Sequence, residues 1–243
     1  MDKETAIASV LRRLSVNTPL TEDDQRAMLM LPMKLERRGR NETILSTGDR
    51  PSTCSFVASG FLFGSKTVAD GKRQIFAFHQ PGDMPDLQSL FLNVIDHDLW
   101  TREESVLGFI PHEPLRHLLR SRPTVATALW RETLVDAARF REWICNIGQR
   151  EGISRLAYLV LEVYIRWKAF EPTTGTTFRF PVSQMLLGEA IGMSTVHVNR
   201  MLQELRHDGL LEFEHGEVTI MNEQKLRELA DFDPLYLHLD QEP

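Results

Sequence analysis

Side chains that can read DNA bases cluster at the start of a predicted helix near the C-terminal end of the sequence. Arg200 carries a planar guanidinium that can donate two hydrogen bonds to the O6 and N7 atoms of guanine, and Asn199 can pair with adenine or contact phosphate. Thr195 and His197 offer further hydrogen bonds, whereas Val196 can only touch a thymine methyl group. This set is typical of the helix that enters the major groove.

Two short helices with a turn between them are predicted to position these side chains. Ser183 is a suitable N-cap for a first helix that runs to Ile191, and Gly192 lies at the break. Ser194 can cap a second helix that ends before Gly209. The positions expected to face inward are apolar or small: Leu187, Gly188, Ile191, Met193, Val198, Met201 and Leu202.

A hairpin is predicted directly after the second helix. Residues 209–220 contain two alternating apolar runs around His215 and Gly216, which suit a tight turn. The segment therefore indicates a winged helix-turn-helix. A closing helix capped by Asn222 is expected next, followed by an apolar tail over residues 232–239 that can pack back on the protein.

Upstream, short apolar runs punctuated by glycine predict an all-β domain from Thr43 to about Ile110. Asp70-Gly71 suits a type I′ hairpin and Pro81-Gly82 a type II turn. The turn glycines recur at nearly regular intervals, which favours a small antiparallel barrel or jelly roll: Gly48, Gly60, Gly71 and Gly82. Before the barrel, Thr21 is expected to cap a helix with acidic residues in its first turn.

A long helix is predicted between the barrel and the winged domain, from about Thr124 to Gly148. One face has the alternating steps of four and three that form a seam between two helices: Ala126, Trp130, Thr133, Ala137, Phe140, Ile144 and Ile147. The alternative is that this face packs on the chain's own barrel. A second apolar row of Leu129, Val135 and Trp143 can serve that purpose, so we favour dimerisation for the first.

The composition is that of a folded protein, and the sequence shows no export signal. The chain has 243 residues, 42% of them hydrophobic, and only two cysteines, Cys54 and Cys145, which we expect to be free and buried. The N-terminus has no apolar run behind a basic patch, and the most apolar stretch is broken by Glu162, so we expect a cytoplasmic protein without a membrane span.

The net charge of −6 is unusual for a protein that binds DNA. Between Arg179 and Met221 the sequence is also acidic, with three basic against six acidic residues: Arg179, Arg200 and Arg206 against Glu189, Glu204, Asp208, Glu212, Glu214 and Glu217. Phosphate contacts must then rely on hydroxyls, backbone amides, helix N-termini and a few arginines. We expect weak nonspecific binding.

The ordered set of glycine-spaced barrel, seam helix and winged helix-turn-helix resembles the Crp/Fnr superfamily of bacterial transcription regulators. The resemblance covers about Leu20 to Ile220 and implies an α+β fold: an antiparallel jelly-roll β-barrel, a long dimerisation helix and a winged helix-turn-helix domain. It also implies a homodimer on an inverted-repeat operator and, for an activator, a contact with RNA polymerase. The expected segments are 1–20, 21–122 (effector barrel), 123–150 (dimerisation helix), 151–222 (DNA-binding domain) and 223–243.

The resemblance also places an effector pocket, in which this sequence departs from the members that bind cyclic AMP. Their Gly-Glu pair falls on Asp86 and Leu87, and their phosphate-binding Arg-Ser pair on His97 and Asp98. The Thr-Ser pair that contacts the purine falls on Phe140 and Arg141. Because Asp86 and Asp98 would repel a cyclic phosphate, cyclic AMP is disfavoured. Two cysteines do not fit the iron-sulfur branch, and isolated histidines such as His79 and His97 do not define a metal site, so the effector stays open.

The DNA contacts carry over with one clear departure. Arg200 matches the arginine that pairs with guanine in this family, but Val196 stands where many members have a glutamate that accepts from cytosine, so a different operator is expected. Ser183, Gln184 and His215 match positions that contact the DNA backbone. Glu217 stands where a wing lysine would help, which weakens the expected wing contact.

Two other classes of protein share parts of this pattern. A cupin-like metal enzyme has a jelly roll but needs closely spaced histidines, and no HxH is present. A small-molecule-binding module of the cyclic-nucleotide type, as in a kinase or channel subunit, would have the barrel without the winged domain. Phosphate-loop, dinucleotide-binding and nucleophile-elbow motifs are absent from the sequence, so we expect a regulator and not an enzyme.

Overall fold

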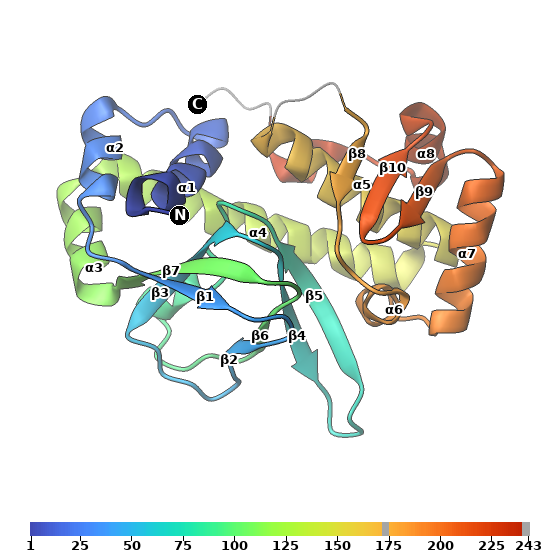
Figure 1. The fold of residues 1–243 in the computed structure, drawn as a ribbon, viewed down its shortest axis with the longest axis horizontal. Coiled ribbons are helices and arrows are strands. Elements are labelled where there is room, and N and C mark those ends of the chain that lie inside the picture. Colours follow the sequence, from blue (N-terminus) through green and yellow to red (C-terminus); the bar gives the residue numbers. More distant parts are fainter. Residues whose placement is uncertain (172–174, 240–243) are drawn as a thin grey trace. The chain divides into compact units, whose positions relative to one another are not determined.

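The computed structural model describes residues 1–171 and 175–239, and the described chain divides into two compact units. The first consists mainly of Met1–Ser65 and Phe78–Ala137. The second consists of Lys66–Ala77 and Ala138–Leu237. The chain is α+β, as predicted, and its elements are labelled in Figure 1.

Two antiparallel sheets form the barrel. One has the order β1-β7-β3 and the other the order β2-β6-β4-β5. Their interior is apolar, with Val57, Leu62 and Leu107 fully buried in one cluster, so the alternation of the strands places one face of each sheet in a common core. The strands are β1 (Lys34–Arg38), β2 (Thr43–Leu45), β3 (Thr53–Ser59), β4 (Leu62–Thr67), β5 (Arg73–His79), β6 (Asp98–Thr101) and β7 (Ser105–Pro111).

The two predicted barrel turns had different outcomes. Gly82 has φ 92° and the Asp83 N–H donates to the Gln80 carbonyl, as a type II turn with Pro81 and Gly82 at its centre requires. The type I′ turn at Asp70-Gly71 was wrong, because Gly71 has positive φ but Asp70 does not. The Gly71 N–H instead donates to the Val68 carbonyl, which closes a longer hairpin loop.

Helices cover the outside of the first sheet. Helix α1 (Lys3–Asn17) packs on β3 and buries Ile7 and Val10, although the sequence analysis assigned residues 1–20 no role. Helix α2 (Glu22–Leu29) begins with the predicted cap, since the Asp24 N–H donates to Thr21 Oγ1. The short 3₁₀ helix η1 (Leu87–Leu90) and helix α3 (His112–Ser121) complete this unit, together with the first half of α4.

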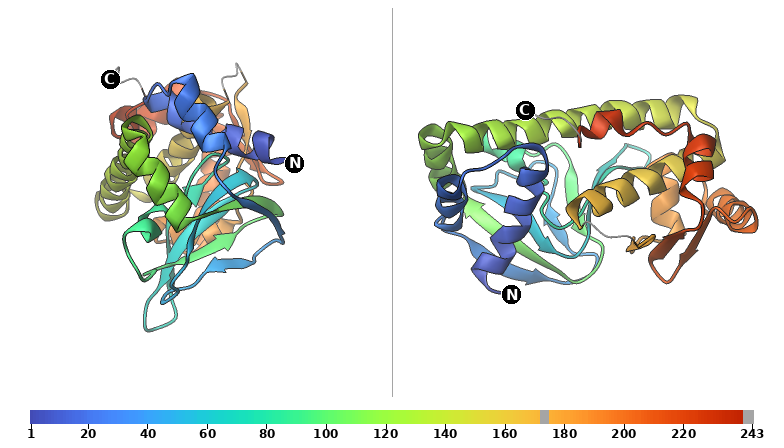
Figure 2. Two further views of the ribbon diagram at one scale, coloured as in Figure 1. Left: turned by 90° about the vertical axis from the view of Figure 1, so that its left-hand side faces the viewer. Right: turned by 90° about the horizontal axis from the view of Figure 1, so that it is seen from above.

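The predicted long helix is present as α4, which runs without a break from Pro123 to Gln149. Figure 2 shows it as the longest rod of the molecule, coloured green to yellow. It carries no proline beyond its first residue, where the missing N–H costs nothing.

The second unit contains the winged domain. Strands are ordered β8-β10-β9, with β8 (Thr177–Arg179), β9 (Leu211–Glu214) and β10 (Glu217–Ile220). The turn between β9 and β10 has positive φ at both His215 and Gly216, as the predicted tight hairpin requires. The helices are α5 (Gly152–Phe170), α6 (Gln184–Ile191), α7 (Thr195–His207), α8 (Glu223–Ala230) and the 3₁₀ helix η2 (Pro234–Leu237). Asn222 caps α8 as expected, and the end of the predicted tail segment, residues 240–243, lies outside the described residues.

Within residues 1–171 and 175–239, no helix has both the length and the apolar character needed to cross a membrane.

Candidate nucleic-acid interface

Helices α6 and α7 form the predicted helix-turn-helix, and each begins at the predicted cap. The Leu186 N–H donates to Ser183 Oγ and the His197 N–H donates to Ser194 Oγ. Between the helices, Gly192 adopts the left-handed conformation with φ 71° and ψ 38°, which is favourable for glycine. The turn therefore follows directly from the local sequence.

The close approach of the two helices depends on Gly188. A Cβ atom at this position would lie 2.4 Å from the Met193 carbonyl oxygen, closer than any ordinary contact. The Met193 N–H also donates to the Gly188 carbonyl at 2.9 Å. The predicted inward residues are buried, except that Met193 is partly exposed.

A residue that the sequence analysis did not identify, Arg155 on α5, fixes the end of α6. Its Nη1 atom donates to the Ile191 carbonyl at 2.8 Å, and its Nη2 atom donates to the Arg150 carbonyl. A cation at a helix C-terminus satisfies carbonyls that have no partner within the helix. No sequence signal marks Arg155, because its partner is 36 residues away.

The first turns of α7 present the predicted reading residues to solvent. Val196 is 79% exposed, and Arg200 is exposed without a hydrogen bond or ion pair to any described residue. Asn199 Nδ2 donates to Gln184 Oε1 at 3.2 Å, so this pair of predicted contact residues is brought together across the two helices. Ser194 Oγ and His197 Nδ1 lie 2.9 Å apart. Arg200 is thus a cation on this face that has no acid to neutralise it.

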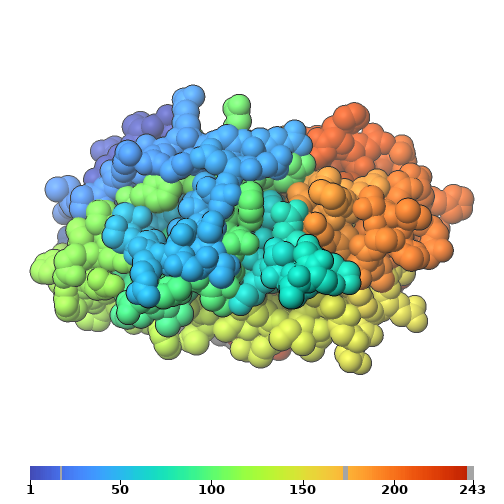
Figure 3. Space-filling view, turned by 90° about the horizontal axis from the view of Figure 1, so that it is seen from below, coloured from blue at the N-terminus to red at the C-terminus, as the bar shows by residue number. Residues whose placement is uncertain are grey.

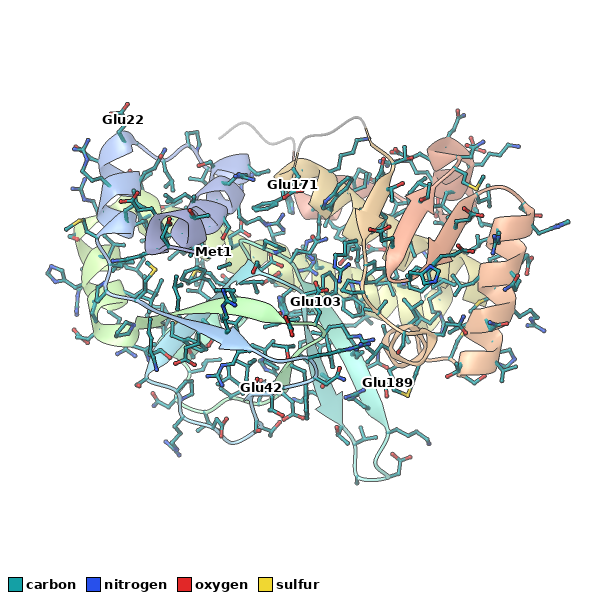
Figure 4. The ribbon with its side chains drawn as sticks, viewed as in Figure 1. Met1, Glu22, Glu42, Glu103, Glu171 and Glu189 are labelled. Carbon is teal, nitrogen blue, oxygen red and sulfur yellow. The ribbon has the colours of Figure 1, made fainter. Side chains whose placement is uncertain are left out.

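Three of the acidic residues near the interface have arginine partners. Arg206, at the end of α7, pairs with Glu212 at 3.2 Å and with Glu214 at 2.8 Å, so β9 neutralises this arginine. Glu189 on α6, labelled in Figure 4, accepts from Nε and Nη2 of Arg73 on β5 at 2.9 and 2.7 Å. Glu189, Glu212 and Glu214 therefore bind arginines of the same unit.

The wing and the start of α6 place the remaining predicted contact residues at the surface. His215 is exposed at the tip of the hairpin, next to Glu217, which is also exposed. Ser183 and Gln184 are partly exposed at the N-terminus of α6. Met185 is 55% exposed beside them and was not predicted, and the next two residues of the helix, Leu186 and Leu187, are buried.

The predicted seam of α4 contains large apolar side chains that the described chain leaves open to solvent. Trp130 is 64% exposed and Ile144 72%, and Leu134, outside the predicted seam, is 51% exposed. Phe140 is 40% exposed and packs edge-on against Phe76 of β5. Figure 3 shows the later part of α4, in yellow, at the surface. Ala126, Thr133, Ala137 and Ile147 are partly exposed.

The second apolar row of α4 is buried, as expected, but one of its members has a different partner. Leu129, Val135 and Trp143 are 3%, 5% and 7% exposed. Trp143 does not seat the barrel: its Nε1 atom donates to Glu162 on α5 at 3.0 Å, inside the second unit.

The predicted effector residues of the barrel lie mostly in its wall. Asp86 is 2% exposed and accepts from the Ser55 N–H at 2.7 Å, and burial raises the pKa of Asp86 to about 7. Leu87 is also buried, in η1, so neither side chain is open to a ligand. Asp98 accepts from the Thr47 N–H, and His97 lies 3.0 Å from Asp96. Phe140 and Arg141 are exposed on α4.

The candidate thiol and metal sites lack the required geometry. Cys54 is buried, and burial with the nearby Asp86 charge raises the pKa of its thiol to about 12, which keeps it protonated. Cys145 is exposed, so the expectation that both thiols are buried was wrong for this one. His79 lies on β5 and His97 precedes β6, and β4 separates these strands, so the two are not on neighbouring strands. No group of three metal-binding side chains occurs in the part of the chain that the structure describes.

Comparisons with known proteins agree with this architecture. A model of the cyclic nucleotide-binding domain matches residues 36–122, and a model of the Crp-like helix-turn-helix domain matches residues 154–229. The transcriptional activator protein FnrA of Stutzerimonas stutzeri is 26% identical over 80% of this chain and 81% of its own length. The nitrogen fixation regulation protein FixK of Rhizobium meliloti is 24% identical over 77% of this chain and 83% of its own length. The solved structure of FixK2 from Bradyrhizobium japonicum superposes with a TM-score of 0.76 at 22% identity, covering 84% of this chain and all of that one.

Proposed function

The chain belongs to the Crp/Fnr superfamily of transcription regulators, and we propose that it acts as a homodimer that binds an inverted-repeat operator through α7. The two matched domains and the regulator relatives favour this class over the cupin-like enzyme and over a binding module without DNA-binding activity. We retain the expected division into an N-terminal segment, effector barrel, dimerisation helix, winged domain and C-terminal segment.

The exposed, unpaired Arg200 on the first turns of a capped helix is the observation that carries this proposal. In a helix-turn-helix these turns enter the major groove. The guanidinium of Arg200 can reach guanine O6 and N7, and Val196, at 79% exposure, can meet a thymine methyl group but cannot accept from cytosine. Asn199 can exchange its bond to Gln184 for adenine or phosphate, and Thr195 and His197 add hydrogen bonds.

Contacts with the DNA backbone come from Ser183, Gln184 and His215 in this proposal. The N-terminus of α6 supplies backbone amides that favour a phosphate oxygen. Because Arg206 is paired with Glu212 and Glu214, few cations contribute, so sequence-independent binding is weak.

Dimerisation through α4 is supported by its open apolar face. Trp130, Leu134 and Ile144 are large apolar residues on a single helix, and each is more than half exposed. Single exposed apolar residues are common on protein surfaces, but several together on one helix indicate an interaction surface. The predicted seam repeats at the four-three spacing of paired helices. A twofold partner would cover these side chains and would supply the second recognition helix that an inverted repeat requires.

The effector is a molecule other than cyclic AMP in this proposal. Asp86, at the position of the nucleotide-binding glycine, is buried and bonded to the Ser55 N–H, and His97 and Asp98 replace the phosphate-binding pair. Two cysteines in the sequence are too few for a four-thiolate iron-sulfur cluster. We further propose a cytoplasmic regulator that contacts RNA polymerase if it activates transcription.

Selection of duplexes from a random pool, followed by fluorescence anisotropy on the recovered sequence, tests the function. We expect an inverted repeat and tighter binding than to a scrambled duplex, with two protomers per duplex in sedimentation. Arg120→Ala, on α3 of the first unit, is the matched control for arginine loss and should bind as the unaltered chain does. Failure to recover any duplex sequence would overturn the proposal.

A further inference from the structure

The buried carboxylate of Glu162 is a junction in the second unit. Glu162 lies on α5 and is 1% exposed. Its Oε1 atom accepts from Nε and Nη2 of Arg139, each at 3.2 Å. Its Oε2 atom accepts from Trp143 Nε1 and from the Tyr236 hydroxyl, each at 3.0 Å. A buried carboxylate is strongly disfavoured without such partners, so these donors hold it in place.

The donors come from two different segments. Arg139 and Trp143 lie on α4, in the half that belongs to the second unit, whereas Tyr236 lies in η2, after α8. Glu162 therefore joins α5 to α4, and the C-terminal segment binds the same carboxylate. Burial and the nearby Glu162 charge raise the pKa of Tyr236 well above its usual value, so its hydroxyl remains a donor.

Aromatic packing holds the C-terminal segment over this junction. Phe232 lies 4.7 Å from the Tyr158 ring, and Tyr236 stacks on Tyr158 at 6.0 Å. The Arg150 guanidinium lies over Tyr158 at 3.9 Å, and Leu237 is 1% exposed. The red chain in Figure 2 turns back after α8 toward these helices. Two side chains of the segment, Phe232 and Leu237, are thus buried, and Tyr236 is partly buried between them.

The segment lies beyond the residues that the domain model matches. The model of the Crp-like helix-turn-helix domain ends at residue 229, so Phe232, Tyr236 and Leu237 lie beyond it. α5 carries the helix-turn-helix through Arg155, which binds the last carbonyl of α6. The angle between α5 and α4 consequently decides how α7 is presented from the dimerisation helix.

We propose that residues 231–237 are a positioning clamp for DNA binding, in which Tyr236, through Glu162, fixes α5 on the part of α4 that belongs to the second unit. This inference rests on the proposed function. When the clamp is released, α5 samples other angles, only a fraction of the molecules present both α7 helices at the operator spacing, and the apparent affinity falls by that fraction.

Tyr236→Phe tests the clamp, because it keeps the ring and removes only the hydroxyl. Tyr164→Phe is the matched control. Tyr164 lies on α5, and its hydroxyl donates to Glu223 Oε2 on α8 at 3.1 Å and accepts from Lys168 Nζ at 3.2 Å, so this variant also loses a hydroxyl–carboxylate bond, but its hydrogen-bond partners lie on α8 and α5 and not on α4. We expect Tyr236→Phe to weaken binding to the selected inverted repeat by about 3- to 10-fold, the size of the ordinary net contribution of one hydrogen bond, while Tyr164→Phe stays within about twofold. Leu235→Ala, on an exposed neighbour, should have no effect.

Hydrogen exchange on the full chain without DNA gives a second readout. Tyr236→Phe should speed exchange in the facing parts of α4 and α5, around Arg139 and Glu162, and leave the barrel strands unchanged. A lower melting temperature for both tyrosine variants with equal operator affinity would overturn the clamp and reduce Tyr236 to core packing. If the unaltered chain selects no duplex, the function fails, whereas the exchange result still decides whether the junction depends on Tyr236.

Discussion

Substitution of Gly188 by alanine should disrupt the helix pair, although alanine is the better helix former. Alanine gains about 1 kcal/mol over glycine in a helix interior. Its Cβ atom, however, would lie 2.4 Å from the Met193 carbonyl oxygen, so the turn must retreat by about 0.6–1 Å to regain contact distance. Forced overpacking of this kind typically costs about 1–3 kcal/mol. We expect a net loss of about 1 kcal/mol and weaker operator binding, because the turn carries α7.

Gly148→Ala provides the control, since this glycine is also helical but has no atom within 4 Å of the added Cβ. It should raise the free energy of unfolding by about 0.5–1 kcal/mol. Urea unfolding of both variants, followed by anisotropy on the selected duplex, measures the difference. If Gly188→Ala is as stable as Gly148→Ala and binds the operator normally, the close contact between α6 and the turn does not constrain the fold, and the reasoning fails.

Four other outcomes are expected. Arg200→Ala should cost about 1–3 kcal/mol per half-site and relax the preference at one base pair, whereas an equal loss on every duplex would make Arg200 a phosphate contact. Ile144→Glu should split the dimer by placing a charge in the seam, and an intact dimer in sedimentation would contradict the seam. Arg73→Glu and Glu189→Arg should each lower the melting temperature. The double variant with the two charges exchanged should recover most of this loss, since a double-mutant cycle isolates the contribution of the ion pair. No recovery would mean that the ion pair does not contribute to stability. Because burial raises the folded-state pKa of Asp86 to about 7 from a usual 3.8, its contribution to stability is present at low pH and is lost as the pH rises through about 7. Asp86→Asn should remove the fall in the free energy of unfolding that Asp86 causes between about pH 4 and 7. An unchanged dependence of the free energy of unfolding on pH would refute this assignment.

Locally encoded features were predicted well from the sequence. The caps Ser183, Ser194, Thr21 and Asn222 satisfy amides within three residues, and the turn at Gly192 requires only a residue that tolerates positive φ. Such signals need no knowledge of the rest of the chain. For the same reason the helix-turn-helix, the wing and α4 were found at nearly their observed bounds.

Features that depend on distant partners were missed. Strand β1 reads KLERR and β8 has only three residues, so neither shows alternation strong enough to predict a strand; both exist because β7 and β10 pair with them. Glu162 was taken only as a polar break in an apolar run, yet it is the buried acceptor for Arg139, Trp143 and Tyr236. The type I′ turn predicted at Asp70-Gly71 was wrong because one extra residue in the loop changes the type of the hairpin turn.

The pairing of Arg206 with the wing acids has a consequence for how the protein searches a genome. Each phosphate neutralised by a free cation expels condensed counterions, and that gain in ion entropy underlies sliding along nonspecific DNA. With Arg206 held by Glu212 and Glu214, little of this gain is available. If the protein binds an operator through α7 as proposed, we expect it to depend on base recognition more than on ionic attraction, so that its operator occupancy changes little with intracellular ionic strength.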